Sequence, residues 1–169
     1  VSKNASLTTA NVLDSTKSNL PSENAPISQG IFFGAAKNDA FANGAPHKPI
    51  EVYFLVPRDA LLMNKFYLGG KWSIEDDFAE NKSVPAKIVI QFNAKEVYFT
   101  GSAENPAPLE LRVDGASSEN ARGRDIKNNI LLIQEERRYH AISFPRKGVH
   151  TLEIVIPATG LRVSSLVFE

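Results

Sequence analysis

Three histidines are the side chains best suited to acid–base chemistry: His47, His140 and His150. A Ser–His–Asp hydrolase also needs a nucleophile and an orienting carboxylate next to the base. No serine of the chain stands in the Gly-x-Ser-x-Gly turn that exposes the nucleophile of many hydrolases. We therefore expect no catalytic triad, and we interpret His140 and His150 as half-exposed strand residues.

Acidic residues gather in one short segment, and Asp76, Asp77 and Glu80 are weak candidates for metal ligands, with Glu75 beside them. Carboxylate oxygens are the ligands that Ca²⁺ prefers. The segment lacks the alternating Asp/Asn/Gly spacing of a calcium loop, and the chain has no clustered His-x-His for a cupin-type metal site. A solvated acidic turn is the favoured interpretation, so we expect neither a metal nor a cofactor.

Two further groups of side chains are suited to binding. A pyranose packs its C–H face on an aromatic ring while nearby polar groups bind its hydroxyls, and the candidates for such a ring are Trp72, Tyr67, Phe32, Phe33 and Phe41. Arg122 and Arg124 are candidates for contacts with phosphate or an acidic sugar, as is the pair Arg137-Arg138. Core packing for the rings and solvated loops for the arginines remain the alternatives.

Composition excludes several classes of function. The 169 residues carry 19 basic and 19 acidic side chains, so no overall positive field is present to hold nucleic acid. The chain contains no cysteine, which excludes a disulfide, a thiolate metal site or a cysteine nucleophile within it. No apolar run approaches the roughly 20 residues that span a bilayer. The chain begins at Val1 rather than Met, so we expect a fragment or a processed protein.

The chain divides into an arm and one domain. Residues 1–25 are rich in Ser, Thr, Asn and Ala and are typical of a linker or flexible arm. Residues 26–169 are expected to form a single domain. Ile88, Ile90 and Phe92 alternate with more polar residues, which predicts a strand with one buried face. The polar residues 93–95 then predict a turn into a second strand and hence a hairpin.

The same pattern continues through the domain. Short runs with period-two alternation are separated by Gly, Pro and Asp-Gly turn signals, and no long amphipathic helix interrupts them. About nine or ten antiparallel strands are expected. The sequence therefore predicts an all-β domain, a β-sandwich or jelly roll.

The order of several motifs resembles the C-terminal domain of DipZ-type proteins over about residues 26–169. The matching stretches include Phe-Tyr-Leu-Gly-Gly-Lys-Trp at 66–72, Phe-Asn-Ala-Lys-Glu-Val-Tyr at 92–98 and Gln-Glu-Glu-Arg-Arg-Tyr at 134–139, with others at 26–44, 77–80, 113–115, 148–152 and 166–168. Two departures are Ser-Gln-Gly at 28–30, where the family usually has a Pro-Glu pair, and the closing Phe-Glu in place of Phe-Gly.

The resemblance implies the surroundings of the domain. DipZ-like proteins join a DsbD-like membrane electron-transfer segment to a thioredoxin-like domain with a Cys pair and then to this jelly roll, and they are linked to thiol-disulfide exchange and cytochrome c biogenesis. The jelly roll of these proteins is similar to carbohydrate-binding modules. The chain would be a non-enzymatic accessory domain on the extracytoplasmic side, in the periplasm or cell envelope, as part of a membrane-anchored or exported protein.

Three functions follow as alternatives. The first is ligand binding, with a glycan or a redox client protein as partner. The second is a structural domain that docks and positions the neighbouring thioredoxin-like domain. The third is a small jelly-roll glycan-active enzyme. The sequence names neither the ligand nor the oligomeric state.

Overall fold

A computed structural model describes residues 24–59 and 61–169. The predicted arm at 1–25 therefore lies almost entirely outside the described residues. Eleven strands and one 3₁₀ turn occur in order: β1 Ile31–Phe32, β2 Ile50–Phe54, β3 Phe66–Ile74, β4 Ala79–Asn81, β5 Ala86–Ala103, β6 Ala107–Val113, β7 Ala116–Ser117, η1 Ser118–Asn120, β8 Ile126–Lys127, β9 Ile130–Ile133, β10 Arg137–Ile156 and β11 Leu161–Phe168. Within this part of the chain, no helix is long and apolar enough to cross a membrane.

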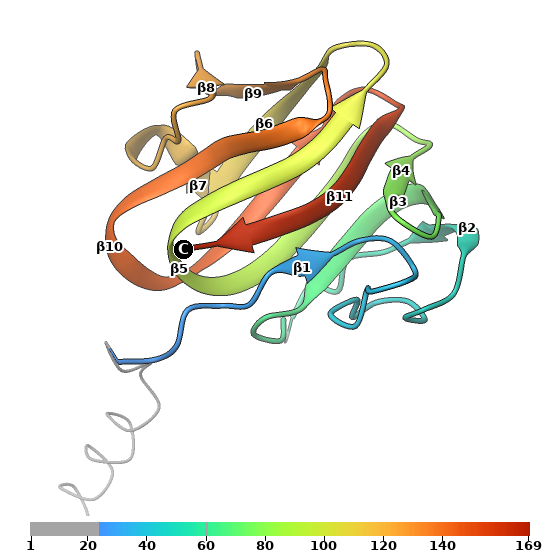
Figure 1. Cartoon of the computed structure of the whole chain (residues 1–169), viewed down its shortest axis with the longest axis horizontal. Coiled ribbons are helices and arrows are strands. Elements are labelled where there is room, and N and C mark those ends of the chain that lie inside the picture. Colours follow the sequence, from blue (N-terminus) through green and yellow to red (C-terminus); the bar gives the residue numbers. More distant parts are fainter. Residues whose placement is uncertain (1–23, 60) are drawn as a thin grey trace, which may run out of the picture.

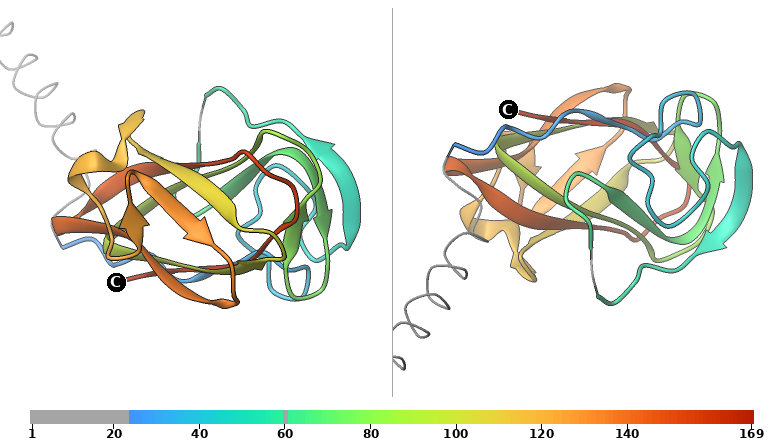
Figure 2. Two further views of the ribbon diagram at one scale, coloured as in Figure 1. Left: turned by 90° about the horizontal axis from the view of Figure 1, so that it is seen from above. Right: turned by 90° about the horizontal axis from the view of Figure 1, so that it is seen from below.

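Two long bent strands, β5 and β10, pair antiparallel along nearly their whole length and take part in both layers of the fold (Figure 1). The first half of β5 pairs with β3, and its second half pairs with β11. On its other side β10 pairs with β6, which continues to β9 and β8. The views from above and below show the two layers facing each other (Figure 2).

All strand pairs are antiparallel, and the predicted all-β sandwich is confirmed. The inner faces of both layers form one continuous core. Ile88, Ile90 and Phe92 are fully buried, as their alternation predicts. After the bend of β5, the inward positions become Val97 and Phe99.

The predicted hairpin at 93–95 is wrong, because β5 runs through these residues without reversing. The register with β10 shifts here, where residues between Ser143 and Gly148 bulge opposite the bend. The bend changes which residues point inward, from even to odd numbers. The polar residues that suggest a turn thus mark the point where β5 passes from one layer to the other.

Asn81 ties the turn between β10 and β11 to β4. It is fully buried. Its Nδ2 donates to the carbonyl of Ala158 at 2.7 Å, and its Oδ1 accepts from the backbone N–H of Leu161 at 2.8 Å. The side chain therefore satisfies the buried N–H of Leu161 and the partly buried carbonyl of Ala158.

We predict that Asn81→Ala destabilises the domain by about 1–3 kcal/mol, because it leaves a buried donor and a buried acceptor without partners. The free energy of unfolding from urea denaturation measures this. Asn105→Ala, at an exposed turn residue, is the matched control and should change the unfolding midpoint little. Equal loss in both variants would contradict the role given to Asn81.

Candidate functional site

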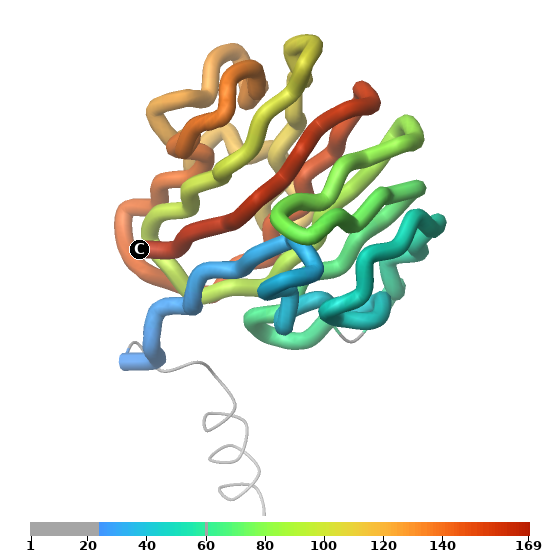
Figure 3. Tube along the Cα trace, turned by 45° about the vertical axis from the view of Figure 1, so that its right-hand side comes forward, coloured from blue at the N-terminus to red at the C-terminus, as the bar shows by residue number. Residues whose placement is uncertain are grey.

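The most exposed of the five candidate rings is Phe32 in β1. Strand β1 pairs with β11, so that Ile31 faces Leu166 and Phe32 faces Ser165. Because neighbouring side chains of a strand point to opposite faces, Ile31 is buried and Phe32 points outward with 46% of its surface exposed. Figure 3 shows the segment before β1 running beside β11. Pairing with β11 therefore decides that Phe32 presents its ring to solvent.

Phe32 lies between two hollows that share its ring and Lys37. The first has a volume of about 540 Å³, and its lining includes Gln29, Lys37, Asp39, Asn64 and Lys65. The second has a volume of about 300 Å³, and its lining includes Lys37, Asp76, Asp77, Ser164 and Ser165. Hydrogen-bond donors and acceptors thus surround an exposed aromatic ring, which is the arrangement that binds sugars.

A close backbone contact positions the second hollow. The N–H groups of Ala35 and Ala36 donate to the carbonyls of Glu75 and Asp76 at 2.8 and 3.0 Å. A Cβ on Gly34 would collide with the backbone of Asp76 and Asp77. Glycine at 34 therefore lets the two loops approach and brings the carboxylates beside Phe32. The Nζ of Lys37 lies 5.2 Å from the centre of the Phe32 ring.

Asn93 anchors the segment that borders the first hollow. Its Nδ2 donates to the carbonyls of Ala25 and Pro26 at 3.2 and 3.0 Å, and its backbone N–H donates to the Ser28 hydroxyl at 2.8 Å. Ser28 also hydrogen-bonds to Asn64, which lines the hollow. Ser28, one of the departures from the DipZ pattern, thus fixes the edge of the candidate site.

Four of the predicted rings, those of Trp72, Phe33, Phe41 and Tyr67, are core residues, each with 4% or less of its surface exposed. The indole N–H of Trp72 donates to the carbonyl of Gly69 at 2.9 Å. Phe33 lies 4.4 Å from Phe66, centre to centre. These positions rule out the four rings as ligand platforms: the sandwich packs Trp72, Phe33 and Phe41 in its core, and Tyr67 is buried with its hydroxyl accepting from the backbone N–H of Leu62 at 2.8 Å.

The acidic candidates lie apart from any ligand cluster. Asp76 and Asp77 are exposed, whereas the Glu80 carboxylate is paired with Lys82 at 3.1 Å and lies 3.8 Å from Arg162. In residues 24–59 and 61–169, no three His, Asp or Glu side chains gather in a way that can hold a metal ion.

Arg122 and Arg124 share a loop but have different surroundings. Arg122 is exposed and lies 3.4 Å from Glu119. Arg124 borders a third hollow, of about 610 Å³, lined by Tyr98, Asp125, Arg137, Arg138, His140 and Glu169. Sequence reasoning omitted Tyr98 and Glu169 from the candidates, and only the alternation of Arg138, His140 and Tyr98 on their strands could have indicated a shared face.

Asp125 fixes one side of this third hollow. Its carboxylate accepts from Arg137 at 3.0 Å and from the backbone N–H of His140 at 2.6 Å. Burial by itself raises the pKa of Asp125, but these two hydrogen bonds outweigh it and lower the pKa below its ordinary value. The same pairing raises the pKa of Arg137. Asp125 is therefore ionised at neutral pH and holds Arg137 in place.

The histidines are bound in ways unlike a hydrolase. His140 Nε2 hydrogen-bonds to Glu96, and the hydroxyl of Ser143 donates to the other oxygen of Glu96 at 3.0 Å. The carboxylate thus separates the serine from the base, whereas a triad needs the base between them. Among the described residues, no hydroxyl side chain hydrogen-bonds to a histidine ring.

The comparison with protein families agrees with the resemblance in the sequence. Residues 28–168 match the family model described as the thioredoxin-like C-terminal domain. A search of curated proteins gives no match. Among solved structures, a family two carbohydrate esterase from Cellvibrio japonicus matches with 14% identity and a TM-score of 0.49, over 61% of this chain and 30% of the esterase chain.

Asp39, which lines the first hollow, forms a titratable pair with His47. His47 Nε2 contacts the Asp39 carboxylate at 2.5 Å, and Nδ1 donates to the carbonyl of Ala35 at 2.9 Å. Both contacts raise the pKa of His47. The pair therefore contributes its full stabilisation of the fold at pH values below the ordinary pKa of histidine. This contribution is lost as the pH rises through the raised pKa.

We predict that Asp39→Asn lowers the pKa of His47 toward its ordinary value, because the carboxylate that favours the protonated ring is removed. An NMR titration of the imidazole Cε1–H signal measures the pKa directly. Asp77→Asn, in the second hollow, is the control and should leave the His47 titration unchanged. An unchanged pKa in Asp39→Asn would show that the pair does not persist in solution.

Proposed function

This chain belongs to the family of thioredoxin-like C-terminal domains, and we propose that it is a non-catalytic ligand-binding domain of a longer, DipZ-like thiol-disulfide protein. Without cysteine, it cannot itself exchange disulfides. The redox chemistry would belong to a neighbouring thioredoxin-like domain. We place the protein, on the same proposal, on the extracytoplasmic side of a membrane.

The exposed ring of Phe32 between its two hollows carries this proposal. A pyranose ring can pack on the phenyl face while its hydroxyls reach polar groups on both sides. Lys37 and Gln29 supply donors, and Asp39 and Asp77 supply acceptors. Since these groups surround one ring, a glycan is the ligand class that the geometry favours over a purely apolar molecule.

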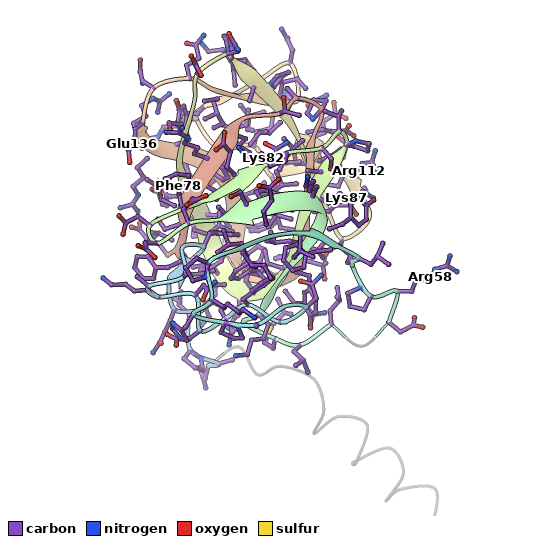
Figure 4. The ribbon with its side chains drawn as sticks, turned by 90° about the vertical axis from the view of Figure 1, so that its right-hand side faces the viewer. Arg58, Phe78, Lys82, Lys87, Arg112 and Glu136 are labelled. Carbon is purple, nitrogen blue, oxygen red and sulfur yellow. The ribbon has the colours of Figure 1, made fainter. Side chains whose placement is uncertain are left out.

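A second candidate function is docking of a neighbouring domain, and a different surface favours it. Strand β2 pairs with β3 alone among the described elements. Beside it, Tyr53, Leu55 and Leu62 are 63%, 77% and 59% exposed. Figure 4 shows Arg58, from the loop that follows β2, projecting away from the body of the domain. Apolar side chains along an open strand edge are typical of a surface that another domain covers.

We predict that Phe32→Ala abolishes measurable glycan binding, because its ring is the aromatic platform that both hollows share. The measurement is a glycan array with the isolated domain, followed by NMR titration of each hit, since Trp72 is buried and is a poor fluorescent reporter.

Tyr53→Ala is the matched control, because it removes an exposed ring on β2 and should leave glycan binding intact. Under the docking alternative the pattern reverses, and Tyr53→Ala weakens binding to a thioredoxin-like domain while Phe32→Ala has no effect. Glycan binding that survives Phe32→Ala would refute the site that we propose.

A further inference from the structure

The third hollow lies on the same face of the same layer as Phe32. The strand register forms a row in which Phe32 faces Ser165, Ser165 faces Thr100, and Thr100 faces Arg138. The next row places Val167 beside Tyr98 and Tyr98 beside His140. Since neighbouring strands lie about 4.8 Å apart, three steps separate Phe32 from Arg138 by about 14 Å.

The side chains that alternate with these residues along the strands confirm which face is outward. Leu166, Phe99 and Tyr139, the residues between the outward ones, are buried. Phe32 and the third hollow therefore occupy one continuous outer surface, across β1, β11, β5 and β10.

Stacked side chains hold the guanidinium groups of the third hollow. The Arg138 guanidinium carbon lies 3.9 Å above the Tyr98 ring, and Tyr98 in turn stacks on His140 at 4.7 Å and 19°. His140 Nδ1 accepts from the backbone N–H and the Nε of Arg124 at 3.1 and 3.2 Å. Preorganised guanidinium groups lose less freedom when a ligand binds.

A glycine lets the Arg124 loop approach this stack. A Cβ at Gly123 would collide with the carbonyl of His140. The backbone N–H of Gly123 donates to the carbonyl of Ala141 at 3.0 Å. The loop is thus fastened against β10, and it carries Arg124 to the rim of the hollow.

The charges of the hollow suit a ligand with one negative charge. Arg137 is paired with Asp125, and Arg138 with Glu169 at 2.5 Å. In the part of the chain that the structure describes, Arg124 has no carboxylate within ion-pair distance. Three guanidinium groups and two carboxylates line the hollow. If His140 is not counted, these side chains leave a net charge of +1.

The contact between Arg138 and the Glu169 carboxylate indicates that a carboxylate fits against these guanidinium groups. This exposed side chain already bonds to Arg138. A guanidinium fork matches the planar carboxylate group in shape, with two parallel hydrogen bonds. A phosphate carries up to two charges and would meet repulsion from Asp125 and Glu169, whereas a single carboxylate balances Arg124.

We propose that the hollow around Arg124 and Arg138 binds the carboxylate of a uronic acid unit, so that the ligand of this face is an acidic glycan. Tyr98 and Asp125 supply a hydroxyl and an acceptor for the hydroxyl groups of the same sugar. The inference extends the proposed glycan binding to a second part of the face, and it can hold or fail without Phe32.

The test uses an α-1,4-linked galacturonate oligomer and the fully methyl-esterified form of the same oligomer, titrated into the isolated domain by calorimetry at low salt. We expect the acid to bind and the ester to bind at least about tenfold more weakly. Arg124→Gln and Arg138→Gln should each weaken binding of the acid by about tenfold or more. Glu169→Gln should strengthen it, because a competing carboxylate is removed.

Arg122→Gln is the matched control, two residues from Arg124 in the same loop but paired with Glu119 outside the hollow, and it should change nothing. Arg124→Lys keeps the charge without the planar fork and should bind with intermediate affinity. Thermal unfolding of each variant, compared with the wild type, separates lost binding from lost folding.

Several results would overturn the inference: no binding of the acid, equal affinity for acid and ester, or full affinity in folded Arg124→Gln and Arg138→Gln. Displacement of the acid by tetraglutamate or inorganic phosphate at equal or lower concentration would assign the hollow to a peptide or a phosphate instead. Phe32→Ala tests the two proposals separately: loss of affinity for both acid and ester supports the Phe32 site, whereas a preference for the acid that is lost in Arg124→Gln and Arg138→Gln supports the arginine hollow.

Discussion

The pairing of β5 with β10 is the constraint on which the rest of the structure depends. Both strands are long enough to serve both layers, and each bends where the register shifts between Ser143 and Gly148. Every other strand is joined to these two by direct pairing or through one or two intermediate strands. Because the bend exchanges inward and outward residues of β5, it decides that Tyr98 lies on the outer face while Phe99 is buried.

The two outer faces that result are chemically different. On the layer of β3, β5, β10 and β6, Glu153 lies between Lys87 and Arg112 at 3.4 and 3.8 Å, and Figure 4 shows these two cations on the same side of the domain. Such paired charges give this part of the surface a hydrated character. The layer of β1, β11, β5 and β10 instead presents Phe32, hydroxyl side chains and stacked arginines. This contrast is the reason for placing ligand binding on one face only.

The sequence predicts the fold class well because period-two alternation is a local property. It predicts the aromatic site poorly because exposure depends on pairing between distant strands. Phe32 and Phe33 are neighbours of the same type, and only the register of β1 with β11 turns one outward and the other into the core. Trp72 is buried for the same kind of reason, because the inner face of β3 is covered in the folded domain.

The third hollow is harder still to predict from sequence. Its residues come from β5, the loop before β8, β10 and the residue after β11. Arg122 and Arg124 look equivalent in the sequence, and only the close approach at Gly123 brings Arg124 alone against His140. The signal that assembles the hollow is thus a backbone contact between segments far apart in the chain.

The three histidines are of a residue type suited to catalysis, but their contacts in this structure are those of connecting residues. Each is bound to a carboxylate: His47 to Asp39, His140 to Glu96 and His150 to Asp114. In the last two pairs the partners come from different strands or turns, so each contact joins separate parts of the sandwich. His140 also orients Arg124 through its second nitrogen. An imidazole with both nitrogens engaged in this way is a structural connector, and its rigidity is of more use to a binding face than to proton transfer.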